Sequence, residues 1–199
     1  MTAPAAEIEC LACGIFKREM AELSRLGKLT IPCRFLDSML HMMPTLLEEQ
    51  LGKVIQTAEK NSFILVYGDC QPRMFELDAK PNIQRVEGMN CCEIILGRTR
   101  YRELRAQGVF FLLPEWTERW EEVFQTYLGF NHQNAKTFMQ EMHSELLYLD
   151  TGVCPVPEET LMKVADFCGL PYSVMPVSLV YLHEAIDAAL HKLIEVNAA

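Results

Sequence analysis

Residues 62–68 read SFILVYG, an unbroken apolar run that ends at a glycine. A strand with one face in water would alternate apolar and polar residues, so a run without alternation is typical of a strand that is buried on both faces, as in a parallel sheet. A second run of this kind, VFFLL, occupies residues 109–113 and stops at Pro114. The two runs predict a core of parallel strands that is covered by helices.

Shorter strand candidates and amphipathic stretches alternate around these two runs. Further strands are expected at residues 8–12, 30–36, 146–149 and 172–177, and helices at 16–26, 44–60, 91–105, 117–128, 133–145, 157–167 and 178–196. This alternation predicts an α/β fold in which helices cover both faces of a mainly parallel sheet, as one three-layer domain over residues 1–199. Residues 71–89 show no such pattern and are expected to form an irregular excursion next to the functional site.

Composition excludes several classes of protein. Half of the 199 residues are hydrophobic and 23% are charged, as in ordinary globular domains. The net charge of −9 repels phosphate backbones, which argues against general nucleic-acid binding. No apolar run reaches the roughly 18 residues that a membrane helix needs, and no secretory signal is visible, so a cytoplasmic protein is expected. In a reducing compartment, the eight cysteines indicate metal binding or redox chemistry rather than disulfides.

Cysteines recur where an α/β sheet places its ligands, beyond the carboxyl ends of the strands. Cys13 ends the first expected strand, Cys70 follows the third, and Cys91 opens a helix after the irregular stretch, while His41 follows the second strand. Three thiolates hold a [4Fe–4S] cluster and leave one iron open, and three thiolates with His41 complete a tetrahedral zinc site. The cluster is the preferred cofactor because three cysteines from three segments satisfy it without His41.

Other cysteines near these positions are interpreted differently. Cys10 and Cys13 form the C-x-x-C spacing of redox pairs, but Cys10 lies inside an expected strand and is expected to pack there. Cys91 and Cys92 are adjacent, so one of them is expected to face the core. The helix dipole is expected to favour the thiolate of Cys91. A purely structural role also remains open for the whole set, because free cysteine is among the most often buried residues.

Four ordered motifs carry a resemblance to a known family. They are Ala12-Cys13 followed by Glu19, Leu40-His41-x-x-Pro44, Tyr67-Gly68-x-Cys70, and Cys91-x-x-x-x-Leu96-Gly97-x-x-x-Tyr101. Over about residues 8–150 the chain resembles an uncharacterised prokaryotic family, domain of unknown function 1638. The resemblance implies that Cys13, His41, Cys70 and Cys91 are the shared positions, and it leaves Cys10 and Cys92 unmatched.

The same resemblance implies a metabolic setting, because members of the family are often encoded near corrinoid-dependent methyltransferases. This chain departs from the family pattern at two places. Met89-Asn90 stands where a His-Asp pair usually precedes the third cysteine, and residues 71–74 replace a glycine-rich stretch. The substrate or partner is therefore expected to differ from that of typical members.

Several functions remain open. The first is a metal- or cluster-binding protein in one-carbon, methyl or sulfur metabolism, which would be an enzyme or an accessory factor. Its ligands would be Cys13, Cys70 and Cys91, and His41 would be a fourth ligand or an acid–base group. The alternatives are a zinc-thiolate methyltransferase-type protein, a metal-free enzyme with Cys91 as nucleophile and His41 as base, and a non-enzymatic accessory protein for a metallocofactor. The expected partner is a small-molecule substrate, or a metalloenzyme or corrinoid protein, and a homo-oligomer is also open.

Overall fold

The computed structural model describes residues 7–58 and 60–198, and its strands form two parallel sheets. Residues 1–6, which belong to the N-terminal segment in which no secretory signal was visible, lie outside the described residues. The first sheet has the order β2-β1-β3-β4, with β1 at Ile8–Cys13, β2 at Cys33–Leu36, β3 at Ser62–Val66 and β4 at Ile83–Arg85. The second has the order β5-β6-β7, at Val109–Leu112, Glu145–Asp150 and Tyr172–Pro176. The predicted α/β class with parallel strands is confirmed, and the strands are divided between two sheets.

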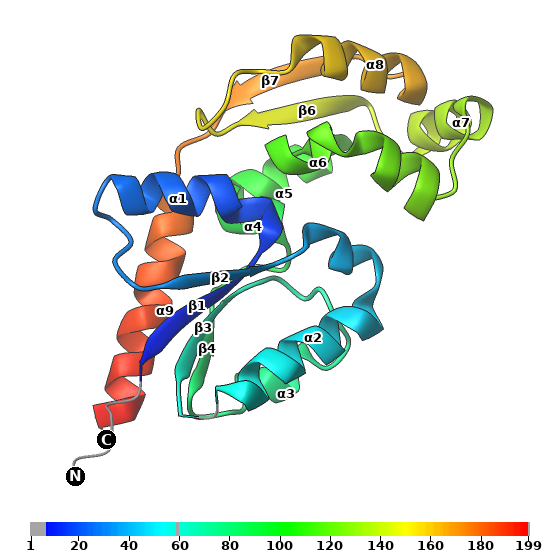
Figure 1. Ribbon diagram of the computed structural model, residues 1–199. Helices are drawn as coiled ribbons and strands as arrows, with labels where there is room; N and C mark the ends of the chain where they lie inside the picture. Colours follow the sequence, from blue (N-terminus) through cyan, green and yellow to red (C-terminus); the bar gives the residue numbers. More distant parts are fainter. Residues whose placement is uncertain (1–6, 59, 199) are drawn as a thin grey trace.

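Helices connect successive strands and surround both sheets (Figure 1). They are α1 (Lys17–Arg25), α2 (Pro44–Thr57), α3 (Met74–Asp78), α4 (Cys91–Leu96), α5 (Arg98–Ala106), α6 (Pro114–Glu118), α7 (His132–Met142), α8 (Glu158–Cys168) and α9 (Val180–Ala198). Short 3-10 turns occupy Gly14–Phe16 and Ser38–Met42, and Glu122–Tyr127 is π-helical. Within the described ranges, none of these helices combines the length and the hydropathy needed to traverse a bilayer.

Strand order explains how helices cover both faces of the first sheet. The chain moves from β1 outward to β2 and then back past β1 to β3, so right-handed connections place α1 and α2 on opposite faces. The connection to β4 continues in the same direction and adds α3 beside α2. C-terminal α9 packs on β3 and β4 (Figure 1). Three layers therefore form around the first sheet, as the sequence predicts.

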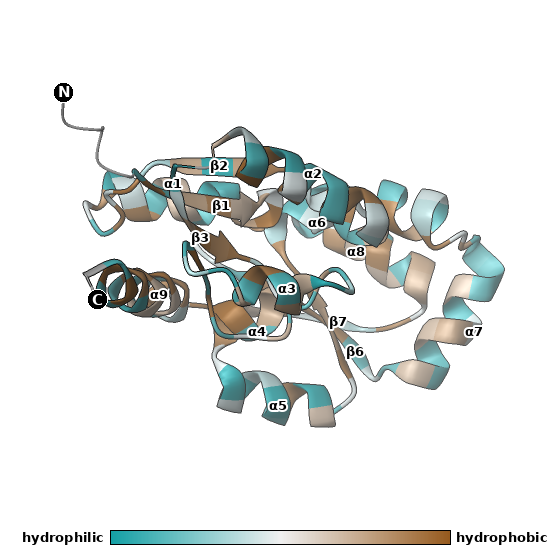
Figure 2. Ribbon diagram, turned by 90° about the horizontal axis from the view of Figure 1, so that it is seen from below, coloured by the Kyte–Doolittle hydropathy of each residue, from teal (hydrophilic) through white to brown (hydrophobic). Residues whose placement is uncertain are grey.

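The second sheet separates two hydrophobic clusters. Along β6, Leu147 and Leu149 belong to the larger cluster that also contains the first sheet, whereas Leu146 and Tyr148 belong to a smaller cluster under α7 and α8. Alternate residues of a strand point to opposite faces, so β6 is buried on both sides and reads as a continuous apolar run. Figure 2 shows β3 as a brown, hydrophobic segment inside the molecule, with the mostly hydrophilic α5 at the margin. The larger cluster joins the carboxyl ends of the first sheet to one face of the second.

Two local predictions are wrong. Residues 71–89 are not an irregular excursion, because they contain α3 and the edge strand β4, whose three residues are too few to show a periodicity. The single helix expected at 91–105 is two helices, because Gly97 has a φ of +75° and breaks the helical path between α4 and α5. The second difference shapes the predicted site, because Cys91 and Cys92 of α4 and Tyr101 and Arg105 of α5 line the cavity described below.

Candidate functional site

A cavity of about 320 Å³ lies where the carboxyl ends of the first sheet meet the second sheet. Cys13, His41, Cys70 and Cys91, the four positions predicted from the sequence, all line it. Residues Val109, Phe111 and others from the region of β5 form much of the remaining wall. The fold therefore places residues that are distant in sequence around one space.

Topology places Cys13 and Cys70 side by side. Cys13 is the last residue of β1, and Cys70 follows the neighbouring strand β3. The chain leaves β1 toward β2 on one side and leaves β3 toward β4 on the other, so a crevice opens between the two strand ends. Such a switch point is where open parallel sheets bind ligands. Both cysteines are nearly inaccessible to solvent, at 5% and 7% of their surface.

Gly68 allows Cys91 to approach these two cysteines. A Cβ atom at Gly68 would lie 2.3 Å from the carbonyl oxygen of Met89 and 2.5 Å from Cα of Asn90. The loop before α4 thus crosses directly over the end of β3, where the amide of Asp69 donates a hydrogen bond to the Met89 carbonyl at 2.8 Å. Only glycine permits this approach, and it brings the first residue of α4, Cys91, to the carboxyl end of β3.

Asn90 holds the start of α4 in place. Its side-chain oxygen accepts a hydrogen bond from the Glu93 amide at 2.9 Å, which is the usual N-cap interaction. Its side-chain nitrogen donates to the Tyr101 hydroxyl at 2.7 Å, which ties the cap to α5. Asn90 therefore fixes where Cys91 projects.

Thiol pKa values show that the three cysteines act on one another. The hydrogen-bonding interaction of Cys91 with Cys13 raises the pKa of Cys91 well above its ordinary value, and burial and the charges of Cys13 and Cys70 raise it further. Burial raises the pKa of Cys70 to about 11, with a further contribution from Cys13. The sulfur atoms of all three residues are thus electrostatic neighbours.

The expected effect of the helix dipole on Cys91 is not observed. A lowered pKa was predicted from its place at a helix start, but the pKa is raised. Helix α4 has only six residues, so its dipole is small, and the side chain is buried among other thiols that disfavour a negative charge. In the absence of a bound cation, the thiol form is therefore stabilised.

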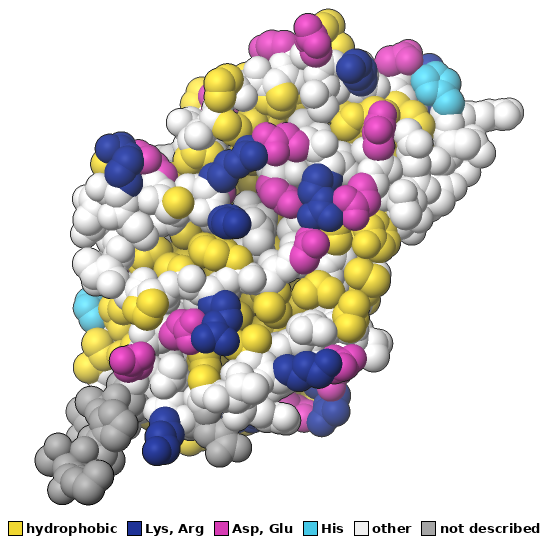
Figure 3. Space-filling view, in the orientation of Figure 1, with side chains coloured by type: hydrophobic (Ala, Val, Ile, Leu, Met, Phe, Trp, Pro, Cys, Tyr) yellow, Lys and Arg dark blue, Asp and Glu magenta, His cyan; other side chains and the backbone are white. Residues whose placement is uncertain are grey.

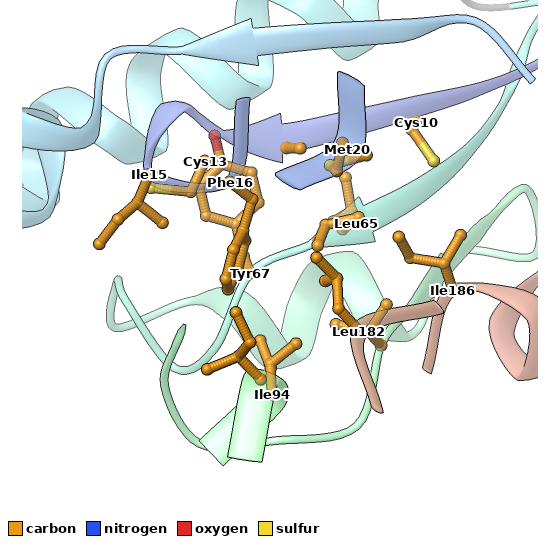
Figure 4. Close-up of a cluster of buried hydrophobic side chains, with 14 of the residues drawn as sticks. Cys10, Cys13, Ile15, Phe16, Met20, Leu65, Tyr67, Ile94, Leu182 and Ile186 are labelled. Atoms are coloured by element: carbon orange, nitrogen blue, oxygen red, sulfur yellow. The ribbon is translucent and has the colours of Figure 1, made fainter. Parts of the chain in front are cut away.

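Tyr67, which the sequence did not single out as a site residue, completes this group. Its side chain is 1% exposed, and its hydroxyl has no hydrogen-bond partner among the described residues. Burial raises the pKa of Tyr67, and so do the charges of Cys13, Cys91 and Cys70, in that order. Figure 4 shows Tyr67 next to Cys13 and Ile15. A buried hydroxyl without a partner is rare in proteins and points to a bound group that would supply one.

His41 lines another part of the cavity wall. Its ring packs edge-on against Trp116, with 5.4 Å between the ring centroids. Burial lowers the pKa of His41, so the imidazole is neutral near pH 7. The indole nitrogen of Trp116 is a second buried polar atom without a partner among residues that the structure describes. His41 therefore shares the cavity with the thiols but contacts the tryptophan.

Cys10 and Cys92 differ in their relation to the cavity. Cys10 pairs in register with Cys33 of β2, and its pKa is raised first by a hydrogen-bonding interaction with that residue. Figure 4 shows Cys10 farther back along β1, away from Cys13 and Tyr67. Cys92 lines the cavity, and burial raises its pKa to about 12. The structure therefore groups Cys10 with Cys33 rather than with the residues of the cavity.

The side chains are not yet arranged as ligands around one ion. Within residues 7–58 and 60–198, no group of three or more His, Cys, Asp and Glu side chains is positioned to hold a metal ion. A cysteine thiol has three staggered positions about its side-chain bond, so metal binding at this wall would require the cysteines to change rotamer. The donor set, three thiols in a mostly apolar pocket, suits soft metal ions and clusters.

Charged side chains on the surface pair with one another. Arg119 illustrates this, because it bonds to Asp37 at 2.7 Å, to Glu122 at 2.8 Å and to Glu115 at 3.2 Å. On the face drawn in Figure 3, basic side chains lie beside acidic ones. Surface pairs of this kind contribute little to stability.

Comparison with known proteins gives one match. A family model described as "Protein of unknown function (DUF1638)" matches residues 35–186, which include His41, Cys70 and Cys91 but not Cys13. No curated protein and no solved structure matches the chain. The match covers most of the sequence, so this chain belongs to the DUF1638 family of proteins of unknown function.

Proposed function

We propose that Cys13, Cys70 and Cys91 hold a [4Fe–4S] cluster in a cytoplasmic protein of one-carbon, methyl or sulfur metabolism. The observation that carries this proposal is the grouping of three interacting thiols, from three separate segments, on the wall of a single cavity. The unpartnered hydroxyl of Tyr67 supports it, because sulfur atoms of a cluster accept hydrogen bonds that tune its potential.

The number of ligands favours a cluster over zinc. Three cysteines are enough to hold a cluster, whereas a structural zinc site needs a fourth ligand. His41, the candidate fourth ligand, packs against Trp116. The absence of a preformed ligand group among the described residues applies to both cofactors and does not separate them. Zinc remains the alternative cofactor.

The cluster would supply one iron without a protein ligand, at which a small-molecule substrate can bind. The chain itself supplies the surroundings. Tyr67 offers a hydroxyl donor beside the thiols, and Phe111 and Leu113 belong to a mostly apolar wall. His41 is neutral and can accept or donate a proton at the cavity surface. An enzyme acting on a small molecule uses all of these features, whereas an accessory protein for a metalloenzyme or corrinoid protein has no need of a cavity for a small molecule.

A metal-free nucleophile is disfavoured by the same thiols. Nucleophilic cysteines react as thiolates, and their surroundings usually lower the thiol pKa. Here the pKa of Cys91 is raised by its interaction with Cys13 and by burial. His41 packs on Trp116, and its lowered pKa makes it a weaker base. A bound cation, in contrast, would favour three clustered thiolates.

Anaerobic purification followed by metal and sulfide analysis tests this proposal. The expected result is a brown protein with about four irons and four acid-labile sulfides per chain. A colourless protein with one zinc per chain would replace the cluster by the zinc alternative. A protein that contains neither metal after anaerobic purification and after reconstitution with iron and sulfide would overturn the proposal.

A further inference from the structure

Most of the cavity wall beyond the thiols is apolar. The side chains that form this part are Ile15, Leu47, Val109, Phe110, Phe111, Leu113 and Trp116. A volume of about 320 Å³ is near the lower end of the range for pockets that bind small molecules. Apolar walls of this size fit the hydrocarbon body of a small organic molecule.

Two buried donors on this wall require an acceptor. The Tyr67 hydroxyl and the Trp116 indole nitrogen are both shielded from solvent and lack a hydrogen-bond partner among the described residues. An indole N–H can only donate, so its partner must be an acceptor atom. A cluster sulfur is the proposed acceptor for Tyr67, so an occupant with an oxygen acceptor is needed to pair the Trp116 donor.

The uncompensated charge at the cavity is positive. Arg105 of α5 lines the cavity, and its exposed side chain has no ion pair or hydrogen bond among residues 7–58 and 60–198, whereas Arg98 and Arg100 pair with Glu93 and Glu103. Asp37 is the one carboxylate among the described residues of the wall, and it is bonded to Arg119 at 2.7 Å. A free guanidinium at a cavity matches the planar geometry of a carboxylate.

We infer that the cavity binds a small organic carboxylate, with its apolar body against the aromatic wall, its carboxylate on Arg105, and an acceptor atom toward Trp116. This inference rests on the proposed function, because it names the substrate class of that same site. Cations and purely apolar molecules are poor occupants, since the first meet Arg105 and the second leave the Trp116 donor unpaired.

Calorimetric titration of the full-length protein with matched probes tests the inference. Benzoate is compared with benzamide and benzylamine, and hexanoate with hexanamide, which separate charge from shape. Each carboxylate is expected to bind about tenfold more tightly than its amide, the effect of one charge-assisted contact. Arg105→Gln should bring the two affinities together. Arg102→Gln, an exposed position on the same helix that does not line the cavity, should leave the preference unchanged.

Three results would overturn the inference: no carboxylate binds, the amides bind as tightly as the acids, or Arg105→Gln keeps the preference. Titration of wild type before and after metal removal keeps it separate from the proposed function. If the protein never contains metal but shows a carboxylate preference that depends on Arg105, the proposed cluster is refuted and the carboxylate site stands. If the metal-loaded protein shows no such preference, the carboxylate site is refuted and the proposed cluster stands.

Discussion

Replacing Tyr67 by phenylalanine should stabilise the metal-free protein, which is unusual for a change at a buried residue. The Tyr67 side chain is 1% exposed, and its hydroxyl has no partner among the described residues. Tyr67→Phe removes this hydroxyl and keeps the ring, so it leaves no cavity larger than one oxygen atom. The unfavourable desolvation of the hydroxyl is then absent from the folded state.

Desolvation sets the size of the effect. An unsatisfied buried polar group costs about 1–3 kcal/mol, so the free energy of unfolding should rise by about that amount. For a chain of this length each kcal/mol shifts Tm by about 2–4 °C, which predicts a rise of between about 2 and 12 °C. In metal-loaded protein the gain should shrink or reverse, because the hydroxyl then has a partner in the wild type.

Tyr101→Phe is the matched control for this experiment. Tyr101 also lines the cavity and is buried, but its hydroxyl accepts a hydrogen bond from Asn90 at 2.7 Å. Its loss should lower the free energy of unfolding by about 0.5–1.5 kcal/mol. Urea titration of both variants, prepared metal-free, measures whether each substitution raises or lowers the free energy of unfolding. A Tyr67→Phe protein that is less stable than wild type would refute the idea that this hydroxyl awaits a ligand.

Three further substitutions examine the parts around the thiols. Burial raises the pKa of Glu19, so the contribution of this carboxyl to stability is present at low pH and is lost as the pH rises through the folded pKa. In urea titrations, Glu19→Gln should therefore be more stable than wild type at about pH 7 and similar to it at about pH 4. Lower stability of the variant at about pH 7 would contradict this. Gly68→Ala would place a Cβ 2.5 Å from Cα of Asn90, so it should lower the free energy of unfolding by about 1–3 kcal/mol or more and reduce metal content. Gly52→Ala is the control, because open space surrounds the new Cβ in α2, and it should raise the free energy of unfolding by up to about 1 kcal/mol. Equal effects of the two substitutions in thermal unfolding would argue against the loop crossing over β3. Cys92→Ala should keep its metal in elemental analysis, because three other thiols are the proposed ligands, and loss of iron would move Cys92 into the site.

Much of the fold could be predicted from local sequence because burial on both faces leaves a clear mark. The apolar runs at 62–67 and 109–113 are β3 and β5 with their first flanking residues, and both lie in parallel sheets. Periodicity does not report which strands pair, since pairing depends on contacts between distant residues. The division into two sheets therefore appears only in the structure. The edge strand β4 is not predicted, because three residues are too few to show a periodicity.

Residue chemistry located part of the site. Cysteines and a histidine at strand ends stand out by type, and the rule for open parallel sheets places such residues together. Tyr67 and Trp116 stand at or near apolar runs, where an aromatic side chain usually packs in the core. Only three-dimensional contacts reveal that their polar atoms lack partners. The reversed pKa shift of Cys91 has the same origin, since it depends on burial and on Cys13.

Metal content of matched cysteine variants tests the central claim most directly. Cys70→Ser and Cys168→Ser each remove one buried thiol, but Cys168, the last residue of α8, belongs to the smaller hydrophobic cluster and does not line the cavity. Both proteins are purified anaerobically beside wild type and assayed for iron, zinc and acid-labile sulfide per folded chain. Three cooperating thiols at one centre predict that Cys70→Ser loses its metal while Cys168→Ser retains the wild-type amount. Equal metal content in the two variants would contradict a centre held by Cys13, Cys70 and Cys91.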